Sequence, residues 1–76
     1  MTIIKNKPDC VKLQFDNGCY AVHPKGSLIV MSDESDRINF KLEASRKTIY
    51  SVKNSELIPN GGTVEETIEL ITPLLN

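Results

Sequence analysis

The chain has 76 residues, of which 39% are hydrophobic, 25% charged and 5% aromatic, and this length allows only one domain, residues 1–76. Nine Lys and Arg against ten Asp and Glu give a formal net charge of −1, so a dedicated DNA or RNA binder is disfavoured. So small a core has no volume to spare for a substrate pocket of about 300 Å³ or more, which disfavours an enzyme.

The first predicted element is a β-hairpin around Asp16-Asn17-Gly18. Apolar and polar residues alternate over 11–15, which is the periodicity of a strand. The Asn-Gly pair can take the positive φ angles of a tight turn. We expect the register that places Tyr20 opposite Phe15, with Val22 on the same face, because both strands then have their apolar side chains on one side.

The same register separates the two cysteines. Cys19 falls opposite Asp16, and Cys10 lies near Lys25 at the far end of the ladder, so we expect two free thiols and a reducing compartment. The N-terminal residues lack the long apolar core of a signal peptide, and no apolar run approaches about 18 residues. These features predict a cytoplasmic protein with no membrane partner. Whether residues 2–5 pair within the chain or with a neighbour stays open.

The next predicted strand, Leu28–Met31, follows a turn at 24–27 and is apolar on both faces. This pattern is typical of a central strand that is covered on both sides. The second cover would be the C-terminal helix or another chain.

A second hairpin is predicted between residues 37–43 and 48–52, where apolar residues again alternate with polar ones. A three-residue loop at 45–47 sets Phe40 opposite Val52, whereas a two-residue loop would set apolar residues opposite polar ones. We therefore expect the three-residue loop.

A connector at 54–62 and a helix at about 63–72 complete the predicted elements. Residues 63–66 match a capping box, with Thr63 as the N-cap. Pro73 cannot donate a backbone hydrogen bond, so the regular helix is expected to end near Thr72 or to kink there. One apolar stripe recurs at helical spacing: Val64, Ile68, Ile71 and Leu75.

These elements together predict an α+β, mainly β fold. We expect an antiparallel meander of about five strands within about residues 10–53, as an open sheet or a small barrel, with one short C-terminal helix. No internal repeat or low-complexity tract divides the chain.

No metal or cofactor site is expected. His23 is the only histidine, and on a strand it stands about 13 Å from Cys19 at ~3.3 Å per residue, too far to share one ion. The acidic cluster at 33–36 lacks the alternating ligands, the glycine and the distal glutamate of a calcium loop, so it is interpreted as a solvated turn.

Anion binding and catalysis are weak alternatives. Gly61-Gly62-Thr63 precedes a helix and could present N–H groups to an anion, but the phosphate-loop lysine is absent and Glu65 and Glu66 would repel a phosphate. One histidine and no glycine-flanked nucleophile leave no catalytic triad. We therefore expect no enzyme activity.

The sequence has more apolar surface than one sheet face can hide, and it has no set of catalytic residues. This combination favours a non-catalytic structural or protein-interaction subunit. Its partners would be further copies of itself or other protein subunits. It would oligomerise or dock through pairing of an edge strand and through contact of the helix stripe with a neighbour. The residues expected to carry this contact are Ile29, Met31, Val64, Ile68, Ile71, Leu74 and Leu75.

The alternative function is a small β domain that binds nucleic acid or acts as a regulator. Such a domain would show aromatic residues exposed among basic ones. In the predicted register all four aromatic residues fall on the apolar faces, so core packing is the better interpretation and nucleic acid is not the expected partner. These residues are Phe15, Tyr20, Phe40 and Tyr50.

The turn and cap residues resemble those of small uncharacterised β-rich proteins encoded in bacteriophage genomes. The resemblance is carried by Phe15-Asp16-Asn17-Gly18, by Pro24-Lys25-Gly26-Ser27-Leu28, and by Ser55-Glu56-Leu57-Ile58-Pro59 leading into Thr63-Val64-Glu65-Glu66. It implies a virion or phage accessory role, in the host cytoplasm or the virion, with no catalytic residues to carry over.

Overall fold

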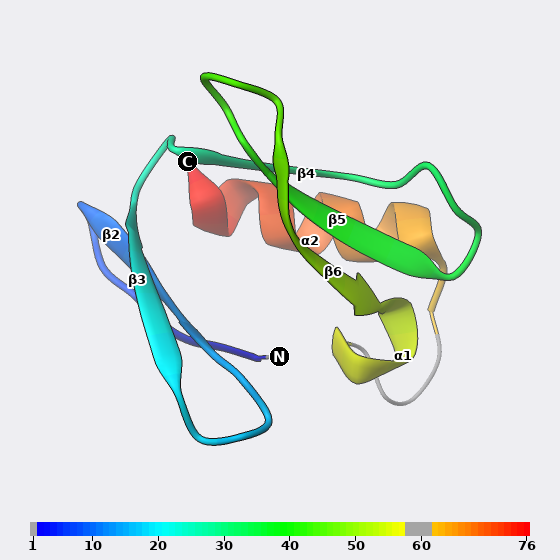
Figure 1. Cartoon of the computed structure of the whole chain (residues 1–76), viewed down its shortest axis with the longest axis horizontal. Coiled ribbons are helices and arrows are strands. Elements are labelled where there is room, and N and C mark those ends of the chain that lie inside the picture. The colour runs from blue at the N-terminus through cyan, green and yellow to red at the C-terminus, as the bar shows by residue number, and fades with distance from the viewer. Residues whose placement is uncertain (1, 58–61) are drawn as a thin grey trace.

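The structure of the chain, a computed structural model, describes residues 2–57 and 62–76 (Figure 1). Within these residues, six strands form two three-stranded antiparallel sheets. The strands are β1 (Thr2–Asn6), β2 (Cys10–Gln14), β3 (Tyr20–Pro24), β4 (Leu28–Met31), β5 (Arg37–Leu42) and β6 (Thr48–Lys53). The helices are α1 (Asn54–Leu57) and α2 (Val64–Leu75).

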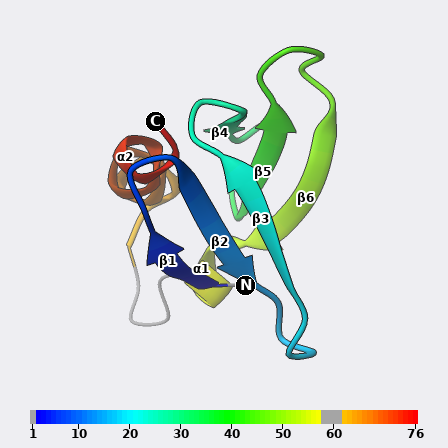
Figure 2. The ribbon, with the colours of Figure 1, turned by 90° about the vertical axis from the view of Figure 1, so that its left-hand side faces the viewer.

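The predicted fold class is confirmed: an antiparallel, mainly β fold with a short C-terminal helix. The sheet orders are β1-β2-β3 and β4-β5-β6, and in the described residues no ladder joins β3 to β4, so the sheets stay open. Figure 2 shows α2 end-on beside the two sheets. One strand, β1, lies outside the predicted range of 10–53 and pairs with β2 of the same chain.

The predicted central position of Leu28–Met31 is wrong. The turn at 25–27 takes the chain from the first sheet to the second, so β4 starts the new sheet and lies at its edge. The central strand is β5, in which Ile38, Asn39 and Phe40 are buried in succession. The helix α2 lies against β4, and Leu28 is buried there. The helix thus supplies one of the two covers that the apolar sequence of β4 requires.

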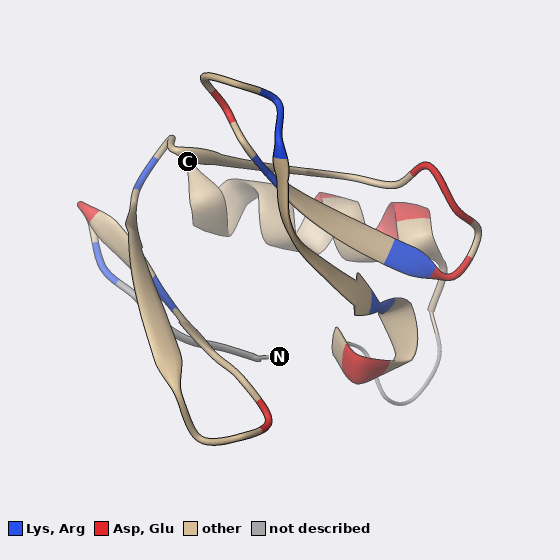
Figure 3. Cartoon of the chain, viewed as in Figure 1, with Lys and Arg blue, Asp and Glu red and all other residues tan. Residues whose placement is uncertain are grey.

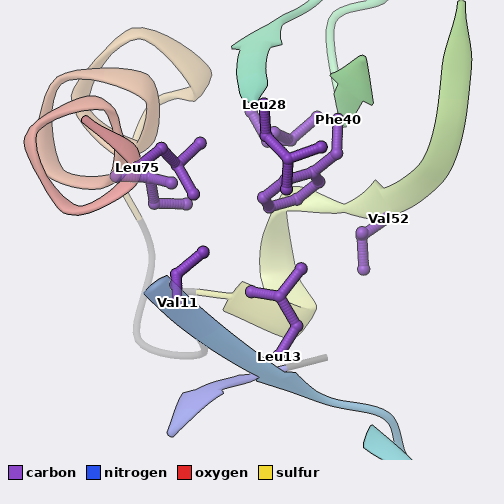
Figure 4. Close-up of a cluster of buried hydrophobic side chains, with 8 residues drawn as sticks. Val11, Leu13, Leu28, Phe40, Val52 and Leu75 are labelled. Carbon is purple, nitrogen blue, oxygen red and sulfur yellow. The ribbon is translucent and has the colours of Figure 1, made fainter. Parts of the chain in front are cut away.

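One hydrophobic cluster joins both sheets and α2 (Figure 4). Its buried members are Val11, Leu13, Leu28, Ile38, Phe40, Val52, Ile71 and Leu75. Val64 and Ile68 pack against this cluster from the same helix. The apolar stripe predicted on the C-terminal helix is therefore part of the core of the chain.

The second hairpin has a longer loop than predicted. The N–H of Leu42 donates to the carbonyl of Lys47 at 3.0 Å, which closes a four-residue loop at 43–46 instead of the predicted 45–47. The longer loop and an irregularity in the ladder between Phe40 and Lys41 together shift the register, so Phe40 lies opposite Tyr50 rather than Val52. The shift is two residues, which is the period of a strand, so the predicted inward face is preserved.

The helix α2 begins as predicted but continues past Pro73 to Leu75. The Thr63 hydroxyl accepts a hydrogen bond from the N–H of Glu66 at 3.1 Å, as expected of an N-cap. At the other end, the Lys25 ammonium donates to the carbonyl of Leu74, and the N–H of Gly26 donates to that of Leu75 at 2.7 Å. Donors from the β3–β4 turn thus satisfy the last carbonyls, which offsets the hydrogen bond that proline removes.

The predicted connector contains a structured junction at Asn54, where α1 begins. Its N–H donates to the carbonyl of Asp36 at 2.7 Å, and its side-chain amide donates to that of Gly62 at 2.9 Å. The hydroxyl of the fully buried Thr67 donates to the Asn54 side-chain oxygen. One residue therefore ties the second sheet to the start of α2; residues 58–61 of the predicted connector lie outside the described residues.

The two sheets also meet at His23 and Tyr50. The His23 Nε2 lies 2.9 Å from the Tyr50 hydroxyl, and the two rings meet edge to face at 5.7 Å. The ring of Phe15 lies 5.2 Å from the same tyrosine. The single histidine is thus a half-buried packing residue between the sheets.

Burial lowers the pKa of His23 from its usual 6.5 because desolvation disfavours the charged imidazole. The unfolded chain then takes up a proton at a higher pH than the folded chain. We expect this group's contribution to stability to be complete above about pH 6.5 and to be lost as the pH falls through the lowered pKa. As the pH falls from about 6.5 through the lowered pKa of His23, the urea midpoint of unfolding should decline more for the wild type than for His23→Gln. Parallel pH profiles for the two proteins would contradict this coupling.

Candidate functional site

The loop of the first hairpin has three residues, one more than the predicted turn allows. The N–H of Phe15 donates to the carbonyl of Cys19 at 2.8 Å, and Gly18, with φ of 86°, occupies the left-handed position that closes such a loop. The ladder then pairs Leu13 with Ala21 and Gln14 with Tyr20. The predicted register is therefore wrong by one residue.

A shift of one residue turns every side chain of β3 to the opposite face. Ala21 and His23 now point between the sheets, and Tyr20 and Val22 lie on the outer face of the first sheet. Tyr20 is 60% exposed and Val22 53% exposed. Two large side chains that were predicted to pack inward are thus exposed on the outer face of β3.

Lysine side chains border these two residues. The Lys12 ammonium lies 3.8 Å from the centre of the Tyr20 ring, which is a cation–π contact. A shallow hollow of about 250 Å³ lies on the same face. We call its lining the basic–aromatic patch: Lys7, Cys10, Lys12, Tyr20 and Val22.

The patch lies beside a free strand edge, because β3 is the last strand of its sheet. At both ends of β3 the backbone forms hydrogen bonds with the β2 side of the hairpin. The carbonyl of Cys19 accepts from the N–H of Phe15, and the N–H of Lys25 donates to the carbonyl of Asp9. Antiparallel ladders alternate, so the backbone groups of Tyr20 and Val22 point to the free edge. No charged residue interrupts β3, although charge is a common protection of edge strands.

The residues predicted to carry the contact are mostly inside the chain. Ile71 and Leu75 are buried, Val64 and Ile68 pack against the core, and Leu74 and Ile29 are half-buried, whereas Met31 is 37% exposed. A hollow of about 240 Å³ between β4 and the end of α2 brings Ile29, Met31 and Leu75 together.

The outward side of α2 has a different character. Glu66, Glu69, Leu70 and Pro73 recur at helical spacing on the side away from the buried Thr67 and Ile71, and all four are exposed. Leu70 is 63% exposed. Figure 3 shows acidic residues and no basic residue on this helix. We call these four residues the outer face of α2.

The other predicted sites have structural roles or lie in part outside the described residues. Asp33 pairs with Lys41 at 3.5 Å, and within residues 2–57 and 62–76 no three His, Cys, Asp or Glu side chains gather closely enough to hold a metal ion. Gly61 of the possible anion loop lies outside that part of the chain. Cys10 and Cys19 are free thiols, as predicted.

Neither of the described helices has the length and apolar sequence needed to cross a bilayer. A search of protein-family models, curated proteins and solved structures finds no match to this chain, so its candidate site is defined by its own geometry.

Proposed function

We propose that this protein is a non-catalytic structural subunit that associates with protein through the outer face of its first sheet. A virion or accessory component of a phage-like assembly is the setting that the sequence resemblance implies. The observation that carries the proposal is the exposure of Tyr20 and Val22 next to each other on an edge strand with no charged residue.

Two physical terms favour association at this place. Removing a large apolar side chain from water contributes about 1.5–3 kcal/mol when burial is complete, and two such side chains lie together here. A partner strand could also pair with the outward backbone groups of Tyr20 and Val22. Tyrosine suits such a contact, since its ring is apolar and its hydroxyl stays hydrogen-bonded to water or to a partner.

Replacing both residues tests the surface. We expect Tyr20→Ser/Val22→Thr to sediment as an 8.5 kDa monomer at concentrations where the wild type has a higher weight-average mass. The matched control is Met31→Ser, which removes another exposed apolar side chain, on β4, and should sediment like the wild type. Equal self-association of the double variant and the wild type would exclude this surface.

A second candidate function is favoured by one observation. Lys12 lies over the exposed ring of Tyr20, with Lys7 nearby, and an exposed aromatic residue among lysines is a feature of single-strand nucleic-acid binders. Titration of the same variants with a labelled single-stranded oligonucleotide separates the two functions. Binding that is lost in Tyr20→Ser/Val22→Thr and weakens with added salt would favour the nucleic-acid function.

A further inference from the structure

We propose that the partner of the basic–aromatic patch is a second copy of the same chain, which contributes the outer face of its α2. This inference rests on the proposed function and names its partner and geometry. Each copy would use its patch toward one neighbour and its helix toward another. The contact would be head-to-tail, with two different surfaces meeting.

The charges of the two surfaces are complementary. The patch holds Lys7 and Lys12, and the outer face of α2 holds Glu66 and Glu69. Across the described part of the chain, no ion pair joins any of these four side chains to a charged group of its own chain. Both sets of charges therefore remain available for an intermolecular contact, where opposite charges fix orientation and exclude wrong pairings.

The apolar groups match in the same arrangement. Leu70 is 63% exposed beside the glutamates of one surface, and Tyr20 and Val22 are exposed beside the lysines of the other. The hollow of about 250 Å³ on the patch can receive a leucine side chain. An apolar centre surrounded by charged residues is the usual composition of a protein–protein contact.

A head-to-tail contact is favoured over a symmetric one. Patch-to-patch pairing through β3 would place two positively charged surfaces side by side, and like charges at a contact are unfavourable. In Figure 2, α2 and β3 lie on opposite sides of β2, so one copy can use its helix and its first sheet at once. Such a contact repeats until it closes into a ring or extends as a filament.

Charge reversal on each surface, alone and in mixture, tests this geometry. Lys12→Glu leaves the patch with no net charge, because Lys7 remains, and it removes the attraction to the outer face of α2 in another copy of the variant. Glu69→Lys does the same from the other side, because Glu66 remains. We expect each variant alone to have a mass of 8.5 kDa by light scattering at about 0.1 M salt, where charges within about 10 Å still interact. An equimolar mixture should regain the mass of the wild type, because the intact patch of one variant meets the intact helix face of the other, and the two reversed residues are again of opposite charge.

The control is Lys47→Glu, a reversal at an exposed residue just after the β5–β6 loop, which should leave the wild-type mass unchanged. Circular dichroism should show that every variant is folded. If the wild type associates, Tyr20→Ser/Val22→Thr does not, and Glu69→Lys still does, the head-to-tail geometry fails while the proposed function stands. A mixture that stays at 8.5 kDa would also overturn the geometry. A monomeric wild type would overturn both.

Discussion

Phe40→Ala should lower the free energy of unfolding by about 3–5 kcal/mol, because truncating a buried aromatic residue loses its transfer energy and leaves a cavity. Phe40 is fully buried in the middle of β5 and meets the ring of Tyr50 edge to face at 6.3 Å. It lies in the cluster that joins both sheets and α2. A domain of this size has about 5 kcal/mol of stability or less from a single core, so the variant should be largely unfolded.

Circular dichroism without denaturant shows whether Phe40→Ala is folded, and urea unfolding measures the loss in any variant that keeps a folded population, including the milder control Phe40→Leu, which keeps most of the side-chain volume. The loss should be several-fold larger for alanine than for leucine. A loss below about 1 kcal/mol for Phe40→Ala would mean that the core is not centred on β5.

Ile71→Asp should unfold the chain. Ile71 is 7% exposed on the inward stripe of α2, and aspartate there would bury a charge without an opposite partner, at a cost of several kcal/mol. Lys47→Glu is the control: Lys47 is exposed just after the β5–β6 loop, and its replacement should change the free energy of unfolding by no more than about 0.5 kcal/mol.

Proton NMR at low temperature measures the outcome for Ile71→Asp through the dispersion of its amide signals. Collapsed dispersion is the expected spectrum. A folded variant that had merely lost self-association would contradict the core position of Ile71 and return the helix stripe to an interface role.

Local patterns predicted β2 to β6 and α2, because period-2 alternation and a capping box depend only on near neighbours, but they did not predict β1 or α1. The sequence pattern was also sufficient for the N-cap at Thr63 and the inward stripe with Ile71 and Leu75. The burial of that stripe in the chain's own core required the position of α2 against β4, which the pattern does not contain.

The first hairpin shows the limit of this reasoning. Maximising apolar pairs placed Tyr20 opposite Phe15, but the loop geometry decided otherwise, with Gly18 in a left-handed conformation and the N–H of Cys19 bonded to the Asn17 side chain. The signal for the three-residue loop was the glycine in its third position. The predicted register placed Tyr20 in the core. A shift of one residue places it instead on the exposed surface that forms the candidate site.

Contacts between distant segments were beyond the sequence pattern. The end of α2 depends on Lys25 and Gly26, which lie 49 residues before its last two residues, and the pattern around Pro73 predicted an earlier end. The bond from Thr67 to Asn54 likewise joins a helix to a segment that was predicted as a connector.

The decisive measurement is the absolute mass of the wild-type chain in solution, by light scattering after size exclusion, over a wide concentration series with reductant present. We predict a mass that rises above 8.5 kDa with concentration and falls back toward it at about 1 M salt, where the Debye length is about 3 Å. A mass of 8.5 kDa at every concentration and salt would contradict self-association through the exposed face of the first sheet.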